Sequence, residues 1–346
     1  MKHIALTNNA LTSLVGDEVA FYEIIGGGRN SRVYRAACHD GRSYAVKQYF
    51  RHLEDKRDRV GTEFYGLRFL WDNGIRNVPY PIRLDKNLDC AVYEYLDGTR
   101  MLSYQASGDD IDTMVNFLTE LNKLSKMKEP NNLPRASEAC FTIRDVIENV
   151  SCRSRRLSSG AIRGSQYSQL REFMVSKFFP LFKAVQEYCF EQCVRFDIEP
   201  DRELPREERT LSPSDFGFHN ALRLADGRIF FLDFEYFGWD DPAKMISDFI
   251  LHPGMELCDE LKKRFVAGIM SRLSGSERIA QRVAVLCPLF GMKWCLILLN
   301  EFIPADLERR WFAGQRREIA ELQAEQMAKA ERMLGLLQQN YQNMLA

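Results

Sequence analysis

The sequence predicts an α+β protein in two parts, a small N-terminal lobe rich in β-strands and a larger, mainly helical C-terminal lobe. Short alternating apolar segments and glycine turns fill residues 1–97, whereas apolar residues recur at helical spacing through much of residues 98–346. The run Glu-Tyr-Leu-Asp-Gly at residues 94–98 marks the boundary. With 346 residues, 45% of them hydrophobic, the chain is long enough for two lobes that each bury a core.

Composition excludes several classes of protein. Lys and Arg (47) nearly balance Asp and Glu (48), and the net charge of -1 indicates no nucleic-acid partner. Residues 1–10 contain no sustained apolar run, and no uninterrupted apolar stretch is long enough for a bilayer, so we expect neither a signal peptide nor membrane insertion. Nine cysteines without a Cys-x-x-Cys pair favour reduced thiols and a cytoplasmic location.

A glycine-rich stretch follows the first expected strand, residues 21–25. The run from Gly26 through Gly28 and Ser31 to Val33 fits the pattern Gly-x-Gly-x-x-Ser-x-Val, with Ser31 where a third glycine is common. Glycine lets a backbone approach phosphate oxygens closely and present N–H groups to them. The pattern therefore favours a phosphate-binding loop, although an ordinary hairpin loop remains an alternative.

The next expected strand, residues 43–48, places Ala45 and Lys47 on one face. A small residue at Ala45 leaves space for a purine ring, which Val33 could cover, and Lys47 could reach the phosphates. Glu63 lies among the apolar positions of a helical stretch over residues 60–71 and could pair with Lys47. The alternatives are a solvated strand lysine and a surface helix charge.

Three polar residues surround a predicted hairpin. Asp226-Gly227 predicts a two-residue turn, which would place Asn220 directly opposite Asp233. Opposed residues have Cβ atoms roughly 4.5–5.5 Å apart, so the two side chains could share one Mg²⁺, a cation that prefers oxygen ligands. Asp215, five residues before Asn220, could accept a proton from an attacking hydroxyl. The alternative is an amphipathic hairpin with acids at its open end.

The C-terminal part predicts a series of helices. We expect them over residues 111–124, 141–150, 169–193 with a break or kink at Pro180, 257–273, 280–302 and 317–344. The helix over 280–302 should be buried, and the last one should pack on the lobe or join two copies in a homodimer. The Arg-rich residues 151–165 are either a mobile solvated loop or a contact for an anionic substrate.

This order of elements resembles the aminoglycoside phosphotransferase and choline kinase group, relatives of the protein kinases, over about residues 20 to 250. The resemblance implies a two-lobed protein-kinase-like fold that binds ATP and Mg²⁺. Carried over by position, it makes Asp215 the catalytic aspartate and Asn220 and Asp233 the metal ligands, while Lys47 contacts the ATP phosphates and pairs with Glu63. It also implies that the backbone of Glu94 and Leu96 meets the adenine.

The chain departs from the group's pattern near the expected catalytic residue. Pro213 stands where the group usually has a histidine, and Gly217 replaces a second histidine that many relatives carry. These departures leave every metal ligand in place, but they leave the subfamily and the substrate open. The segment from Asp241-Pro242 to Asp248 is similar to an element that packs behind the site, so Asp248 is interpreted as structural.

These observations predict a Mg²⁺-dependent phosphotransferase that moves the γ-phosphate of ATP to a hydroxyl of a small molecule. A sugar, an amino alcohol or an aminoglycoside-like compound would fit. Transfer of AMP and a nucleotide-binding pseudokinase are the alternatives, and a protein kinase is disfavoured because residues 233–241 are too few for a peptide platform. The acceptor, the choice of ATP or GTP and the oligomeric state stay open.

Overall fold

The computed structural model describes residues 6–26, 30–51, 57–127, 132–158, 165–312 and 318–344. The chain forms two compact units. One contains Met1–Met101, Phe218–Gly238 and Glu308–Arg316, and the other contains Leu102–Gly217, Trp239–Leu307 and Arg317–Ala346. The predicted division at residue 97 lies close to the first of these boundaries, but the hairpin within 218–238, which we had placed in the helical lobe, groups with the N-terminal unit.

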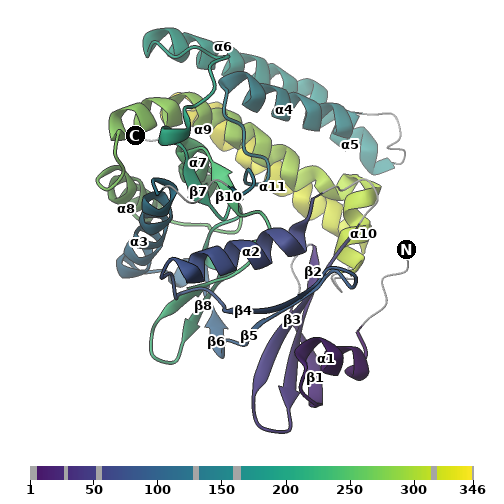
Figure 1. Ribbon diagram of the computed structural model, residues 1–346. Coiled ribbons are helices and arrows are strands. Elements are labelled where there is room, and N and C mark those ends of the chain that lie inside the picture. The colour runs from purple at the N-terminus through teal and green to yellow at the C-terminus, as the bar shows by residue number, and fades with distance from the viewer. Residues whose placement is uncertain are drawn as a thin grey trace. The chain divides into compact units, whose positions relative to one another are not determined.

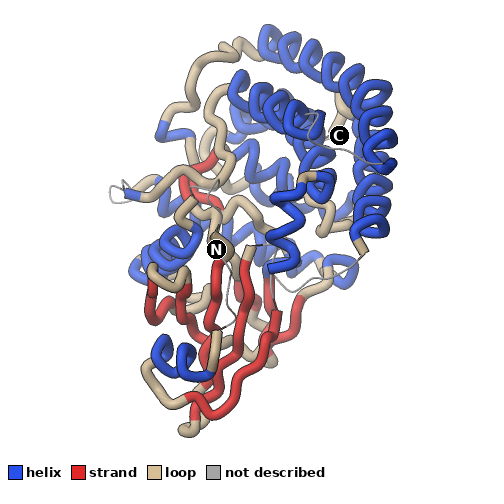
Figure 2. The backbone as a smooth tube through the Cα atoms, turned by 90° about the vertical axis from the view of Figure 1, so that its right-hand side faces the viewer, coloured by secondary structure: helices blue, strands red, loops and turns tan. Residues whose placement is uncertain are grey.

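The N-terminal unit is built on an antiparallel sheet with the strand order β1-β2-β3-β5-β4 (Figures 1 and 2). Its strands are β1 (Val19–Gly26), β2 (Ser31–Cys38), β3 (Ser43–Tyr49), β4 (Pro81–Asp85) and β5 (Cys90–Glu94). Helix α2 (Arg59–Asp72) confirms the expected helix. Helix α1 (Asn8–Val15) was not predicted, and it buries Leu11 and Leu14 in a core that also contains Tyr34 and Val46.

The hairpin residues form strands β8 (Ala221–Leu224) and β9 (Ile229–Phe231), and β6 (Gly98–Arg100) pairs with β8. The predicted register was wrong by one residue, because Ala221 pairs with Phe231. The backbone N–H of Gly227 donates to Leu224 O at 2.9 Å, and the φ of Gly227 is 87°. The loop therefore has three residues, a turn closed by a left-handed glycine, rather than two.

The second unit is mainly helical. It contains the helices α3 (Gly108–Ser125), α4 (Ile143–Ser158), α5 (Ser165–Phe173), α6 (Phe179–Arg195), α7 (Pro242–Leu251), α8 (Asp259–Met270), α9 (Ser276–Leu298) and α11 (Ile319–Asn340). The sequence boundary between Leu307 and Glu308 falls within helix α10 (Pro304–Phe312). Strand β7 (Thr210–Ser212) pairs with β10 (Gly238–Asp240). Among the described residues, short turns of 3₁₀-helix include η1 (Ser103–Gln105), η4 (Arg206–Glu208) and η6 (Leu299–Phe302), and η5 (Phe218–Asn220) in the N-terminal unit.

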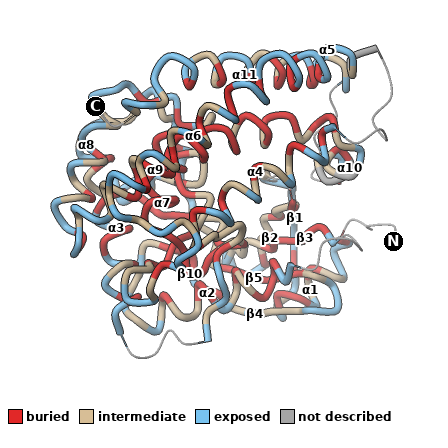
Figure 3. The backbone as a smooth tube through the Cα atoms, turned by 90° about the horizontal axis from the view of Figure 1, so that it is seen from above, coloured by how far each residue is buried: buried red, intermediate tan, exposed pale blue. Residues whose placement is uncertain are grey.

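Helix α9 forms the core of this unit, and α4, α6, α7 and α11 pack against it. Among the described residues one helix, Ser276–Phe302, is long and apolar enough to cross a membrane by length and composition, which the sequence analysis had not anticipated. However, 78% of its most apolar window is buried inside the protein, as Figure 3 shows for much of α9, so the expected burial is confirmed. Helix α11 buries Leu322, Leu334 and Leu337, which confirms packing on the lobe, while a homodimer stays a prediction.

Two expectations for the helices can be compared with the structure, and the first needs correction. Residues 151–158 continue α4 instead of forming a loop, and Arg153 and Arg155 of this stretch pair with Glu138 and Glu148. Residues 159–164 lie outside the described residues. The α-helix is interrupted near Pro180 as predicted: a π-helical turn, Met174–Phe178, separates α5 from α6, and the proline lies in the first turn of α6. Proline has no N–H to donate to the carbonyl four residues before it, and its ring would clash with that carbonyl in a regular α-helix. The wider π-helical turn makes room for the carbonyl.

Candidate active site

A buried lysine at the centre of the N-terminal sheet forms the core of the candidate site. Lys47 Nζ lies 2.7 Å from Glu63 Oε2 and 2.7 Å from Asp233 Oδ1. Strand β3 supplies the lysine, α2 supplies Glu63, and Asp233 follows β9. The side chains of Lys47 and Glu63 are only 9% and 5% exposed, so the solvated alternative is excluded for both.

The charges of this group are strongly coupled. Burial by itself lowers the pKa of Lys47, but the surrounding carboxylates raise it well above its usual value. Burial also raises the pKa of Glu63, and the ammonium group of Lys47 counteracts that effect. The lysine therefore stays charged. The two carboxylates, each 2.7 Å from Nζ, hold the ammonium group in a fixed position from which it could bind an anionic ligand.

Glu235 is a site residue that the sequence analysis missed. One carboxylate oxygen from each of Glu63, Asp233 and Glu235 lies within 4.8 Å of the others, a spacing at which three oxygens could hold a metal ion. Asn30 Nδ2 donates to Glu235 Oε1 at 2.6 Å, whereas Glu235 Oε2 is buried without a hydrogen-bond partner among the described residues. Burial and the nearby charge of Asp233 raise the pKa of Glu235 to about 7. The spacing Asp-Phe-Glu was the available signal, but spacing alone does not show which side chains converge.

The other predicted metal ligand, Asn220, is joined by a backbone hydrogen bond to the residue before Asp233. It ends η5, and its carbonyl oxygen accepts a hydrogen bond from Leu232 N at 2.8 Å. Asn220 is therefore opposite Leu232, so its predicted pairing with Asp233 was wrong by one position. Asp233 itself has a φ of 66°, a left-handed conformation that is uncommon outside glycine and turns its side chain out of the strand alternation.

A pair of buried tyrosines supports the lysine–glutamate pair from behind. Tyr49 OH donates to Glu63 Oε2 at 2.8 Å and lies 2.7 Å from Tyr93 OH. Lys47 also lies 5.0 Å from the centre of the Tyr49 ring. Glu63 Oε2 thus accepts from both the lysine and a phenol, which fixes the orientation of its carboxylate. Tyr49 lies two residues after Lys47 and Tyr93 on the adjacent strand β5.

The predicted nucleotide-binding residues lie along the same strands. Gly26 ends β1, and Ser31 and Val33 lie in β2, where Val33 is directly opposite Lys47. Ala45 lies opposite Tyr93, next to Glu94 at the end of β5, and Leu96 follows as a half-buried residue. Gly28 lies outside the described residues. The predicted lysine and strand residues therefore lie in or next to one sheet, and α2 brings Glu63 against the lysine.

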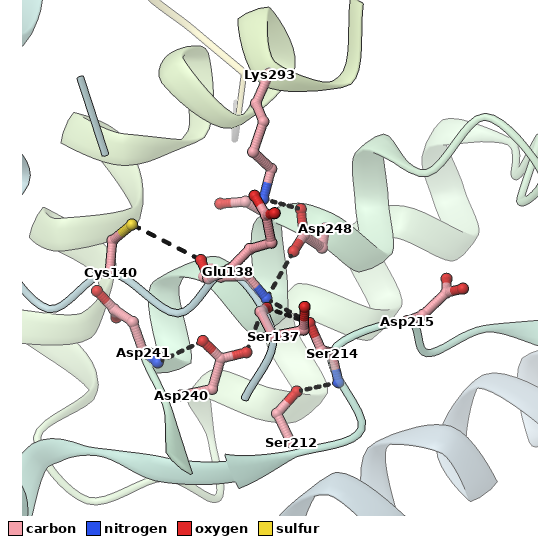
Figure 4. A network of polar contacts seen from close by, with 12 residues as sticks. Ser137, Glu138, Cys140, Ser212, Ser214, Asp215, Asp240, Asp241, Asp248 and Lys293 are labelled. Atoms are coloured by element: carbon pink, nitrogen blue, oxygen red, sulfur yellow. Dashed lines mark hydrogen bonds and ion pairs between the residues drawn. The ribbon is translucent and has the colours of Figure 1, made fainter. Parts of the chain in front are cut away.

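Asp215 belongs to the helical unit, where the residue before it is firmly held (Figure 4). Ser214 has a φ of 69°, a strained value for serine, and its N–H donates to Ser212 Oγ at 2.9 Å. Lys244 Nζ donates to Ser214 Oγ at 2.9 Å. In Figure 4 the carboxylate of Asp215 points away from this network. The loop is therefore fixed while the acid itself stays accessible, with 35% of its side chain exposed.

The lysine that holds this loop lies in a buried network of charges. Lys244 Nζ is 2.8 Å from Asp240 and 3.1 Å from Asp248, and both helix α7 and the preceding strand contribute. Burial alone lowers the pKa of Lys244, but its two carboxylate partners raise it overall. Asp248 also accepts from Trp294 Nε1 at 2.9 Å. This agrees with a structural role for Asp248.

The sequence model of a phosphotransferase enzyme family matches residues 22–280. No curated protein matches the chain.

Several solved structures share the fold. Choline kinase LicA from Streptococcus pneumoniae is 18% identical with a TM-score of 0.59, over 95% of this chain and 97% of that one. The spectinomycin phosphotransferase APH(9)-Ia, solved with ADP and spectinomycin, is 12% identical with a TM-score of 0.62, over 93% and 99%. An ethanolamine kinase from Plasmodium vivax is 14% identical with a TM-score of 0.59, over 96% and 85%. At these identities the likeness shows the fold, and it confirms the predicted kinase-like architecture.

Proposed function

Because the chain belongs to the phosphotransferase enzyme family and is a kinase with an alcohol group as acceptor, we propose that it transfers the γ-phosphate of ATP to a hydroxyl of a small molecule. The observation that carries this proposal is the buried Lys47 held between Glu63 and Asp233 at 2.7 Å from each. Removing an ammonium group and two carboxylates from water has a large desolvation cost, which supports a functional role for this group. Phosphoryl transfer needs a fixed cation at the phosphates, and Lys47 can supply it.

The N-terminal unit would bind the nucleotide. Lys47 would contact the phosphates. The adenine would lie against Ala45 and Val33 and meet the backbone of Glu94 and Leu96. The opposition of Val33 and Lys47 across neighbouring strands supports this arrangement, since it places a ring-covering side chain and the phosphate-binding lysine at one point of the sheet.

Mg²⁺ would be held by Asn220 and Asp233, and the residues present fit a hard cation. Asp233 belongs to a group of three carboxylates whose oxygens lie within 4.8 Å of one another, and one buried oxygen of Glu235 has no hydrogen-bond partner among the described residues. Bound there, the ion would neutralise negative charge on the phosphate oxygens. Asp233 would then contact the ion in place of part of its contact with Lys47.

Asp215 would act on the acceptor. Its carboxylate would orient the acceptor hydroxyl and take its proton while the hydroxyl oxygen bonds to the γ-phosphorus. The bond from that phosphorus to the bridging oxygen of the β-phosphate would break, and ADP would leave with the electron pair. The strained, hydrogen-bonded Ser214 supports this role, because strain of this kind persists where a loop must hold a reactive group in place.

The acceptor class follows from the fold relatives only as a proposal. These relatives include choline kinases, an ethanolamine kinase and a spectinomycin phosphotransferase, and two of the structures contain ADP or AMP. We therefore favour an amino alcohol, a sugar or an aminoglycoside-like molecule, and ATP as the donor. The cytoplasm is the proposed location, because all nine cysteines are free thiols, as in reducing compartments. Recovery of the native protein in the membrane or secreted fraction would refute that location.

The test is transfer from ATP labelled in its terminal phosphate, with Mg²⁺ and a panel of choline, ethanolamine, spectinomycin, gentamicin and a small-metabolite extract. Mass spectrometry would identify the product. Asp215→Ala should abolish transfer while nucleotide binding survives, whereas Asp259→Ala, an exposed acid on α8, should leave transfer unchanged. Release of pyrophosphate would indicate AMP transfer, and nucleotide binding without any labelled product would favour a pseudokinase.

A further inference from the structure

A histidine that the sequence analysis did not single out lies beside Asp215, the proposed catalytic aspartate. His252 Nε2 is 3.4 Å from Asp215 Oδ1, and both residues belong to the helical unit. His252 is the C-cap of α7, and Pro253 after it prevents the helix from continuing. Its side chain is 17% exposed, so the ring is largely enclosed while still reaching the acid.

A backbone hydrogen bond determines which ring nitrogen carries the proton. Gly254 N–H donates to His252 Nδ1 at 3.0 Å, so Nδ1 is an acceptor. A neutral imidazole has one donor and one acceptor nitrogen, and the hydrogen must therefore be on Nε2. That is the nitrogen that faces Asp215. The segment His-Pro-Gly thus creates an N–H donor directed at the acid.

Helix α9 fixes the orientation of the ring. The ring of Trp294 lies edge-to-face against His252 with centroids 4.6 Å apart and planes at 79°. Trp294 is held in turn by its hydrogen bond to Asp248 Oδ1, one turn before His252 on α7. Asp248 pairs with Lys244, which also donates to Ser214. Helices α7 and α9 therefore hold both the residue before Asp215, through Lys244, and the carboxylate of Asp215, through His252.

We propose that His252 is a positioning residue for Asp215. Its Nε2–H donates to Oδ1 and so fixes the orientation of the carboxylate that takes the proton of the acceptor hydroxyl. The inference rests on the proposed function, because it assigns His252 a role in orienting that base. His252 acts by orienting Asp215, which is assigned to the acceptor hydroxyl and not to the nucleotide. Its loss therefore affects the rate of transfer rather than nucleotide binding.

Two substitutions separate hydrogen bonding from packing. His252→Phe keeps a ring against Trp294 but removes the donor, and His252→Gln places an amide N–H where Nε2 was. We expect His252→Phe to lower kcat roughly 10- to 100-fold, the effect of a small misplacement of a reacting group, with the KM for ATP changed by less than about twofold. His252→Gln should retain kcat within about threefold. His39→Phe, at an exposed histidine, is the matched control and should match the wild type.

The measurement is transfer of labelled phosphate to the acceptor panel described above, with urea-unfolding midpoints for every variant. In an Asp215→Asn background, His252→Phe should lower the residual kcat by less than about twofold, because the two residues act as one unit. Wild-type kcat in His252→Phe would overturn the inference. Equal losses in the Phe and Gln variants, each with a lower unfolding midpoint, would also overturn it and show a packing role. A wild-type protein that transfers phosphate to no acceptor would overturn the proposed function and the inference with it.

Discussion

Replacement of Lys47 by methionine tests the site most directly. The side chain keeps its approximate length and loses its charge, so Glu63 and Asp233 lose a partner that lies 2.7 Å from each. We expect the free energy of unfolding to fall by about 3–5 kcal/mol, the usual effect of removing one partner from a buried ion pair. We also expect transfer to be lost, since the phosphates would lack their fixed cation.

The magnitude follows from the geometry. At 2.7 Å and an effective dielectric constant of about 20, each contact corresponds to a gross attraction of about 6 kcal/mol. The cost of removing the charges from water offsets much of that attraction in the intact protein. The substitution leaves this cost on the carboxylates, because Glu63 stays buried while its compensating charge is gone.

Two further variants control for the loss of charge and for the chemistry. Lys86 pairs with Asp58 at 3.0 Å in the same unit, but both side chains are more than half exposed. Lys86→Met should therefore change stability by less than about 1 kcal/mol. Lys47→Arg should preserve most of the stability but not transfer, because a planar guanidinium cannot replace a compact ammonium at the phosphates.

Urea unfolding followed by circular dichroism and transfer from labelled ATP are the two assays. Equal unfolding midpoints for Lys47→Met and Lys86→Met would refute the reasoning from burial. A folded Lys47→Met protein with an unchanged KM for ATP and normal turnover would remove Lys47 from the proposed nucleotide site.

Two other predictions concern groups next to the proposed site. Tyr49→Phe removes only the hydroxyl between Glu63 and Tyr93 and should cost about 1–2 kcal/mol in urea unfolding and raise the KM for ATP; an unchanged KM would contradict its positioning role. Burial tends to raise the pKa of Glu138, but Arg153 lowers it to about 2. This pair therefore stabilises the fold above pH 5 by at most about 3 kcal/mol, and the contribution is lost as the pH falls towards 2. Glu138→Gln should remove that pH dependence from unfolding curves measured between pH 2 and 7, and an unaltered curve would count against the pair.

Local patterns predicted most elements of the fold, because each depends on short-range periodicity. Strand β3 and helix α2 are visible in alternation and helical spacing, and Glu63 among apolar positions already pointed inward. The register of the hairpin was missed because Asp-Gly is compatible with loops of two or three residues. The conformation of Gly227, not the dipeptide itself, selects the longer loop. The π-helical turn before Pro180 was missed for a similar reason, since proline indicates a disturbance without saying which one.

The sequence by itself determined the two-part architecture, the lysine, the acids and their order along the chain. These features depend on residue identity and spacing, which local physical chemistry constrains. Only the tertiary structure decided that Glu235 joins Glu63 and Asp233, and that His252 faces Asp215. Each of these contacts joins residues separated by many positions. Their convergence depends on how helices and strands pack, and that packing is set by the sum of many weak contacts rather than by any one motif.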